Sequence, residues 1–119
     1  GADLLALYRR AVNILGKEEK KDKTEYFGEA DPALFEQDEE RQLFAELADV
    51  LTRTGQAVEA EDFASALTAM SKLRGPVDAF FESVTVNAED GKIRKNLLLL
   101  LSGIRSVLES VAVFSRIEG

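Results

Sequence analysis

The 119-residue sequence contains no cysteine and no histidine, and it has only two prolines. Without cysteine and histidine the chain cannot form disulfides, and it lacks thiol nucleophiles, imidazole bases and the usual ligands of zinc. Strand-like alternation of useful length and internal repeats are also absent from the sequence. The sequence therefore predicts an all-α protein, a single helical bundle that spans residues 1–119.

Long apolar runs are absent as well. The longest run, "LLLLL" at 97–101, lies between Lys95 and Arg105 and is far shorter than the roughly 20 residues that a membrane span needs. We therefore expect a soluble protein with no membrane partner. The chain begins with "GAD" rather than with methionine or a signal sequence, so we expect it to be a fragment of a longer protein, with any catalytic part upstream.

The net charge of −7 comes from 15 basic and 22 acidic residues, and it argues against a domain that binds phosphate indiscriminately. The charges are unevenly distributed. Residues 1–23 contain six basic and four acidic residues and residues 89–119 contain five and four, whereas residues 24–88 contain four and fourteen. If the chain binds a polyanion, we expect its two terminal segments to lie side by side and to form the binding face.

Apolar residues at helical spacing predict about five helices. We expect glycines and the Gly75-Pro76 pair to end several of them, and we expect a long irregular connection at Gly16–Pro32, anchored by Tyr26 and Phe27. The predicted helices are Asp3–Gly16, a second from Gln37 or Asp38 to Thr54 with Gly55 at its end, a third from Val58 or Glu59 to about Leu73, a short one after Pro76, and a last one along Ile93–Phe114.

The last helix has the most regular apolar spacing, which alternates steps of four and three over roughly 30 Å. This seam predicts the spine of the bundle or, where it is exposed, a docking groove. Its residues are Ile93, Leu97, Leu100, Ile104, Val107, Val111 and Phe114. The third helix is expected to bury Phe63, Ala66, Leu67, Met70 and Leu73.

The stretch "RGPVDAFFESV" at 74–84 predicts a short helix that packs through Val77, Phe80, Phe81 and Val84. Both phenylalanines fit a packing role better than a stacking role in RNA binding. Asp78, two residues past the proline, suits the positive end of that helix, and RNA contact is its alternative role.

No catalytic or metal site is predicted. The acidic cluster "EQDEE" at 36–40 has the oxygen ligands that hard cations prefer, but the solvated start of a helix explains these residues without a metal. Ser110 and Ser115 have no base to activate them. A glycine-rich phosphate loop and a nucleophile elbow are also absent from the sequence.

Candidate RNA-binding residues lie in both terminal segments. Several of the first group share one face of the first predicted helix, and the second group crowds the start of the last helix. Arginine and asparagine bind bases and phosphates through directed hydrogen bonds, whereas lysine contributes mainly charge. The first group is Arg9, Arg10, Asn13 and Lys17, and the second is Lys92, Arg94 and Lys95.

Four segments together resemble the C-terminal end of the bacterial glycyl-tRNA synthetase beta subunit. They are "LYRRAVNIL" at 7–15, "DPALF" at 31–35, "LRGPVDAFFESVTV" at 73–86 and "IRKNLLLLLSGIRSVLESVAVFSRIEG" at 93–119. The resemblance covers nearly the whole chain and implies a helical anticodon-binding domain related to the DALR domain of arginyl-tRNA synthetases. The first helix of that DALR domain likewise carries an arginine close to the position that matches Arg10.

The resemblance implies a cytoplasmic parent enzyme, a class II ligase of two alpha and two beta subunits that joins glycine to its tRNA with ATP and magnesium. This segment would carry no active site and no cofactor. Its partners would be glycine tRNA and the alpha and beta subunits, with no DNA. The alternative is a helical scaffold or protein-interaction domain that binds no RNA. The residues expected to bind RNA are Arg9, Arg10, Asn13, Lys17, Arg94 and Lys95.

The sequence also departs from the family pattern. The family usually has "VMVM" where this chain has "VTVN" at 84–87, an arginine at the position of Leu97, and an aspartate at the position of Val113. The last two changes remove opposite charges together, which costs less than the loss of one partner alone. No binding role is therefore expected for Leu97 or Val113.

Overall fold

The computed structural model describes the backbone of residues 2–84, 86 and 88–118, and the side chains of residues 5–84, 86 and 88–112. Over these ranges the protein has five α-helices, one 3-10 turn and no strand, which confirms the all-α prediction. The elements are α1 (Ala2–Asp22), η1 (Pro32–Leu34), α2 (Asp38–Glu59), α3 (Phe63–Ser71), α4 (Arg74–Ser83) and α5 (Gly91–Glu118).

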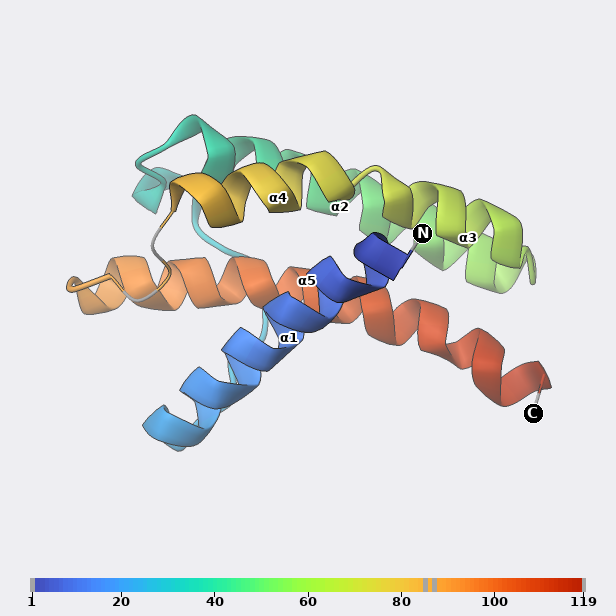
Figure 1. The fold of residues 1–119 in the computed structure, drawn as a ribbon, viewed down its shortest axis with the longest axis horizontal. Helices are drawn as coiled ribbons and strands as arrows, with labels where there is room; N and C mark the ends of the chain where they lie inside the picture. Colours follow the sequence, from blue (N-terminus) through green and yellow to red (C-terminus); the bar gives the residue numbers. More distant parts are fainter. Residues whose placement is uncertain (1, 85, 87, 119) are drawn as a thin grey trace.

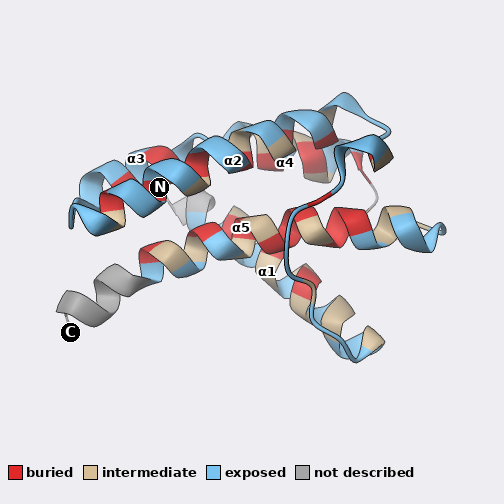
Figure 2. Ribbon diagram, turned by 180° about the vertical axis from the view of Figure 1, so that it is seen from behind, coloured by how far each residue is buried: buried red, intermediate tan, exposed pale blue. Residues whose placement is uncertain are grey.

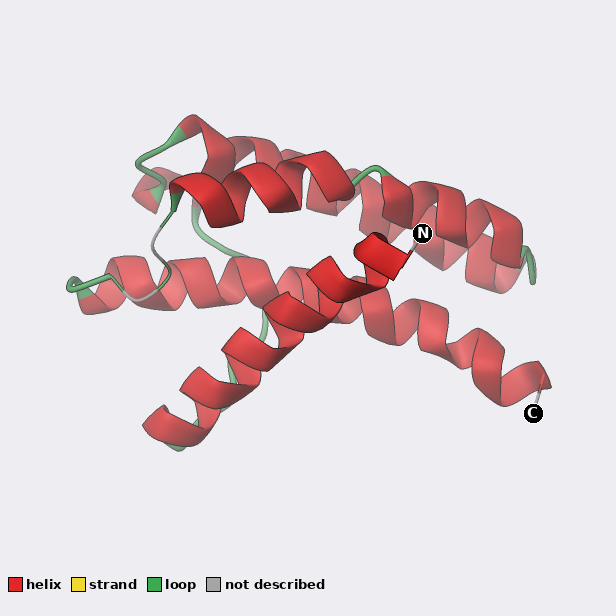
Figure 3. Ribbon diagram, viewed as in Figure 1, coloured by secondary structure: helices red, strands yellow, loops and turns green. Residues whose placement is uncertain are grey.

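Helix α5 is the central element of the bundle. Helices α2, α3 and α4 form one layer along it, and α1 crosses it obliquely (Figure 1). The connection between α1 and α2 is the longest loop and passes across α5 on the side seen from behind (Figures 2 and 3). The two terminal helices thus pack against each other, as the sequence predicts.

The apolar seam of α5 is buried from Leu97 to Val111 and partly buried at Ile93, which confirms its prediction as the spine of the bundle. Leu97, Leu100, Ile104 and Val107 are at most 2% exposed and Val111 is 7% exposed. The buried residues of α5 lie along its middle, where α2 and α1 pack against it (Figure 2). Because other helices cover these side chains, this part of the seam is not a docking groove. The side chain of Phe114, also predicted in the seam, lies outside the described residues, as do those of Val113 and Ser115.

Tyr8 fixes α1 to the other helical layer. Its side chain is 1% exposed, and its hydroxyl donates a hydrogen bond to the main-chain oxygen of Met70 in α3, 2.9 Å away. Burial raises the pKa of the Tyr8 hydroxyl well above its ordinary value, so the group stays protonated and remains a donor. One polar contact inside the core therefore ties α1 to the end of α3.

The loop between α1 and α2 is held on α5 by Asn96. The Asp31 N–H donates to Oδ1 of Asn96 at 2.6 Å, and Nδ2 of Asn96 donates to the Asp31 oxygen at 3.0 Å. Tyr26 anchors the loop as predicted, because its hydroxyl donates to Asp22 at 2.7 Å. The matching prediction for Phe27 is wrong, since that ring is 69% exposed. It lies 5.5 Å from the guanidinium of Arg105.

Two predicted helix ends are wrong, because Gly16 and Gly55 lie inside helices. Helix α1 continues to Asp22 and α2 continues to Glu59. Glycine in a helix interior costs only about 1 kcal/mol relative to alanine, which a run of good helix formers such as "KEEKK" outweighs. The chain instead turns at non-glycine residues in the left-handed region, Lys23 (φ 55°) and Glu61 (φ 56°).

Helix α3 begins at Phe63, later than predicted, because Asp62 caps it. The Asp62 carboxylate accepts hydrogen bonds from the Ser65 N–H at 3.1 Å and the Ser65 hydroxyl at 2.6 Å, and these bonds lower the pKa of Asp62. The residues of α3 that face the core are Ala66, Ala69 and Met70. Phe63 and Leu67 are 43% and 39% exposed, so the prediction that both are buried is wrong.

Helix α4 begins at Arg74, so the Gly75-Pro76 pair lies in its first turn and does not precede it. Proline is tolerated there because its missing N–H would have no helical partner. Asp78 consequently lies beyond the first turn, and the capping position is Leu73, which makes no side-chain cap bond. The predicted capping role of Asp78 is therefore wrong. Thr85 and Asn87 of the divergent "VTVN" stretch lie outside the described residues.

We expect Gly16→Ala and Gly55→Ala each to raise the free energy of unfolding by about 0.5–1 kcal/mol, because alanine has the higher helix propensity. Both sites have room, since an added Cβ would meet no atom within 4 Å. Gly103→Ala is the matched control: its Cβ would lie 3.0 Å from Cδ1 of Leu47, so crowding should offset the gain. Urea unfolding followed by circular dichroism measures all three. Destabilisation by the first two substitutions would show that these glycines end helices.

Candidate nucleic-acid interface

Helix α1 separates its charges onto two faces. Three of its acidic side chains, Glu18, Glu19 and Asp22, point toward α5 and are only 13%, 12% and 22% exposed. Each forms an ion pair with an arginine of α5. The acidic charge of the second half of α1 is therefore used inside the molecule.

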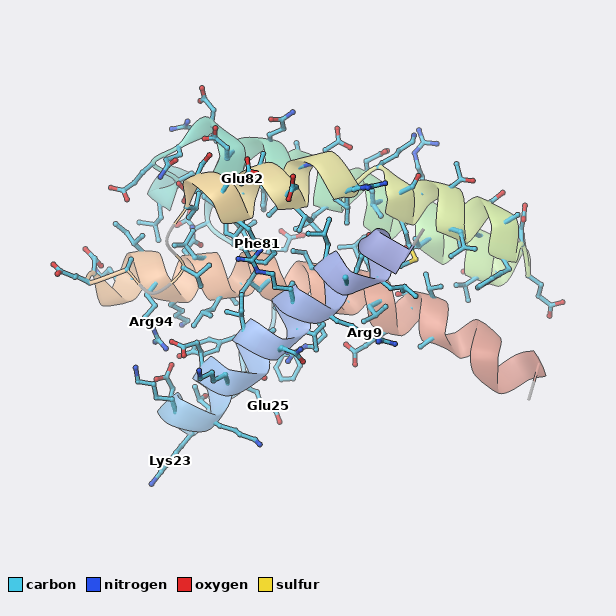
Figure 4. The ribbon with its side chains drawn as sticks, in the orientation of Figure 1. Arg9, Lys23, Glu25, Phe81, Glu82 and Arg94 are labelled. Carbon is cyan, nitrogen blue, oxygen red and sulfur yellow. The ribbon has the colours of Figure 1, made fainter. Side chains whose placement is uncertain are left out.

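Arg94 of α5 binds two of these carboxylates at once. Its Nη2 lies 2.8 Å from Oε1 of Glu18 and its Nη1 lies 2.7 Å from Oδ2 of Asp22. Hydrogen bonds from Arg94 and then from the Tyr26 hydroxyl hold the pKa of Asp22 below its ordinary value. The same bond to Asp22 raises the pKa of Tyr26. Arg94 is 17% exposed and points toward the end of α1 (Figure 4).

Arg105 makes the third pair and also closes the following loop. Its Nη1 lies 2.8 Å from Oε1 of Glu19, and its Nη2 donates to the Tyr26 oxygen at 3.1 Å. The Tyr26 N–H donates to Oε2 of Glu19 at 2.9 Å. Burial alone would raise the pKa of Glu19, but the hydrogen bonds from Arg105 and the Tyr26 backbone hold it below its ordinary value.

On the opposite face of α1, the charged and amide side chains that the structure describes are all arginine, lysine or asparagine, and none is acidic. Successive residues are about 100° apart on a helix, so steps of three and four keep these residues on one side. All are exposed, and we name them the α1 cationic face: Arg9, Arg10, Asn13, Lys17, Lys20 and Lys21. Figure 4 shows Arg9 near the crossing of α1 with α5, and Lys23 just beyond the end of α1.

Arg10 is held in place by an aromatic ring of α4. Its guanidinium carbon lies 4.5 Å from the centroid of the Phe81 ring, a cation–π contact. Phe81 in turn packs edge-on against Phe80, with centroids 5.7 Å apart. Phe80 is fully buried, whereas Phe81 is partly exposed and points from α4 toward α1 (Figure 4). The two phenylalanines therefore have different roles, one in the core and one at the surface beside α1.

Two shallow cavities adjoin Arg10. One, of about 590 Å³, lies between α1 and α4 and is lined by Ala6, Leu7, Arg10, Arg74, Gly75 and Asp78. The other, of about 610 Å³, runs along α1 and is lined by Leu5, Ala6, Arg9, Arg10, Asn13 and Ile14. Both combine apolar side chains with hydrogen-bond donors, which suits the flat faces and polar edges of unstacked bases.

The structure brings together four of the six residues predicted to bind RNA. Arg9, Arg10, Asn13 and Lys17 share the α1 cationic face. Arg94 does not join them, because its guanidinium is paired with two carboxylates. Lys95 is exposed, but it belongs to α5 and is therefore not part of the α1 cationic face.

Sequence reasoning missed Lys20, Lys21 and Arg74. The predicted helix end at Gly16 places the two lysines in a loop, although steps of three and four from Asn13 through Lys17 would have found them. Arg74 has no such signal, since its place beside Arg10 depends on how α4 packs against α1.

The acidic cluster at 36–40 starts α2. Oε2 of Glu40 accepts from the N–H groups of Gln37 at 2.8 Å and Glu36 at 3.2 Å, which completes a capping box, and Glu40 is 2% exposed. Its carboxylate therefore has a structural role.

Within the part of the chain that the structure describes, no helix combines the length and the apolar character that crossing a bilayer requires.

Comparison with known proteins shows one family. Residues 4–113 match the DALR anticodon binding domain. The glycine–tRNA ligase beta subunit of Rhodospirillum centenum is 53% identical over 120 residues, and that of Dinoroseobacter shibae is 50% identical over 119 residues. Each match covers 100% of this chain but 17% and 16% of the respective relative, so the chain spans about one sixth of their length. No solved structure matches the chain significantly.

We expect Arg105→Met to lower the free energy of unfolding by about 1.5–3 kcal/mol at neutral pH, because it leaves Glu19 without its cation. The pKa of Glu19 is lowered in the folded state, so the stability from its pair is present above the ordinary pKa of about 4.3 and is lost as the pH falls through the lower folded value. The difference between variant and parent should therefore shrink in acid.

Urea unfolding at several pH values between neutral and strongly acidic measures this difference. Arg53→Met is the matched control, because Arg53 pairs with Asp49 on the surface, where both side chains are about half exposed and such pairs contribute little. A gap between Arg105→Met and parent that stayed constant down to the acid limit would show that the stability comes from packing rather than from the ion pair.

Proposed function

The chain belongs to the DALR anticodon binding domain family, and from this membership we propose that it binds the anticodon arm of a tRNA through the α1 cationic face. The observation that carries the proposal is the charge separation on α1. Inward pairing of Glu18, Glu19 and Asp22 leaves cations on the outward face, although the whole chain has a net charge of −7. A local patch of this kind supports RNA binding without a broadly basic surface.

The relatives suggest which tRNA and which enzyme. Since they are named glycine–tRNA ligase beta subunits, the proposed ligand is glycine tRNA and the proposed parent is a cytoplasmic ligase with alpha and beta subunits, two of each. In this proposal the domain contributes binding only. ATP and Mg²⁺ would be used in another part of that assembly, where glycine is joined to the tRNA.

The binding mode follows from the side chains. RNA loops are recognised through splayed bases that stack on aromatic or guanidinium planes, and through hydrogen bonds to base edges. The guanidinium of Arg10 is already positioned over Phe81, so less conformational entropy is lost when a base contacts it. Lys17, Lys20 and Lys21 extend the face along α1, where point charges suit the phosphates of the stem.

We expect the double variant Arg9→Glu/Arg10→Glu to weaken binding of transcribed glycine tRNA by about 10- to 100-fold at low salt, because two attractive interactions with phosphates or bases become repulsive. The slope of log affinity against log salt should also fall by roughly one for each phosphate that the variant no longer binds. Fluorescence anisotropy of labelled tRNA measures both quantities, first with the 119-residue chain and then with the full ligase.

The matched control is Arg41→Glu/Arg53→Glu, which changes the net charge equally at exposed arginines of α2. This control should change affinity far less than the α1 variant. Equal losses of affinity in both variants would show that the effect comes from the overall charge of the chain and not from the α1 cationic face. Unchanged affinity in the α1 variant would remove the face from the binding site and favour a helical scaffold without RNA contact.

A further inference from the structure

Asp78 is a carboxylate in a cavity otherwise lined by cationic and apolar side chains, beside the α1 cationic face. Its side chain is exposed on α4, and the carboxylate makes no hydrogen bond or ion pair with the residues that the structure describes. We propose that Asp78 selects, at one position of the bound RNA loop, a base that carries an exocyclic amino group, which among the pyrimidines is cytosine. This inference rests on the proposed function.

The fold removes the structural explanation for this carboxylate. A negative charge stabilises a helix when it lies in the first turn, but Asp78 lies beyond the first turn of α4, which begins at Arg74. Its carboxylate makes no cap bond. Next to a surface that meets phosphates, such a charge repels the ligand. The guanidinium groups of Arg10 and Arg74 line the same cavity and offset part of this repulsion. The carboxylate gains further when it contacts a part of the RNA that donates hydrogen bonds.

In RNA the ribose 2′-hydroxyl and the amino and imino groups of the bases donate hydrogen bonds, and only the bases differ from one position to the next. An ionised carboxylate only accepts hydrogen bonds, whereas a guanidinium only donates them. Cytosine presents an amino donor at N4 next to acceptors at N3 and O2, and Asp or Glu is the side chain that accepts from N4. A cavity that offers Asp78 together with the guanidinium of Arg10 therefore has both kinds of group that this edge needs.

Uracil is the natural competitor and should be rejected. It has the size of cytosine but a carbonyl oxygen in place of the amino group, so two acceptors would face each other at Asp78. Unpaired polar groups of this kind cost enough for strong discrimination, whereas shape alone separates the two pyrimidines poorly. The contact to Phe81 supports the selection, because it limits the movement of Arg10 and so the positions that a base can take.

The experiment measures base preference rather than affinity alone. The 119-residue chain and the full ligase are titrated with glycine tRNA transcripts in which each anticodon-loop position in turn carries cytosine or uracil. For the parent protein we expect about tenfold or greater preference for cytosine at one position. Asp78→Asn should reduce that preference to about twofold or less, because an amide both donates and accepts and can pair with either base.

Glu82→Gln is the matched control, because Glu82 is an exposed carboxylate one turn further along α4 that does not line the cavity. Its side chain points away from α1 (Figure 4). Loss of the preference in Asp78→Asn but not in Glu82→Gln supports the inference. Circular dichroism of both variants checks that α4 remains folded.

Three results would overturn it. They are a parent protein with no preference for cytosine at any position, an Asp78→Asn variant that keeps the preference, and a variant that binds all transcripts more tightly by the same factor. The last result would show that Asp78 only repels phosphate. In each case the proposed function still holds if Arg9→Glu/Arg10→Glu weakens binding, whereas unchanged binding in that variant contradicts the proposed function itself.

Discussion

The pairing of acidic residues of α1 with arginines of α5 is the interaction on which the arrangement of this domain depends. Arg94 and Arg105 draw Glu18, Glu19 and Asp22 against the central helix. This pairing has two effects. It extends α1 past a glycine, and it turns the remaining charges of that helix outward as a group with one sign. A chain with a net charge of −7 thereby presents a cationic surface on α1.

The aromatic pair of α4 connects this surface to the core. Phe80 is fully buried, and the next residue, Phe81, supports the guanidinium of Arg10. Since consecutive residues on a helix point about 100° apart, one short helix can fill the core and position a binding side chain at the same time. Tyr8 acts similarly from the other direction, because its side chain is buried in the core and its hydroxyl ties α1 to the end of α3.

The sequence is sufficient to predict the features that depend on long apolar periodicity. The seam of α5 and the helical class follow from spacing alone, and helical spacing also places four residues of the first helix correctly on one face.

Prediction fails where a weak local signal competes with a distant contact. Gly16 resembles a helix end, yet ion pairs formed by residues just beyond it reach α5, more than seventy residues away in sequence. The same distant contact explains why Arg94 is paired inside the fold, and why Lys20 and Lys21 belong to the surface. Tyr26 and Phe27 look equivalent in sequence, but the hydroxyl of Tyr26 reaches Asp22 and its main chain bonds to Glu19 and Arg105, whereas the Phe27 ring is exposed.

The two faces of α1 also make the helix unusually open to evolutionary change. The residues of α1 that hold the fold and those of the α1 cationic face alternate along the same turns but share no partners in the described structure, since the acids bond to α5, the tyrosine to α3 and Arg10 to Phe81 of α4. Energetic effects of substitutions without shared partners tend to add independently. Selection can thus alter the outward side chains toward a different RNA while the scaffold beneath them stays constant, so that divergence in specificity within such a lineage does not require matching divergence in stability.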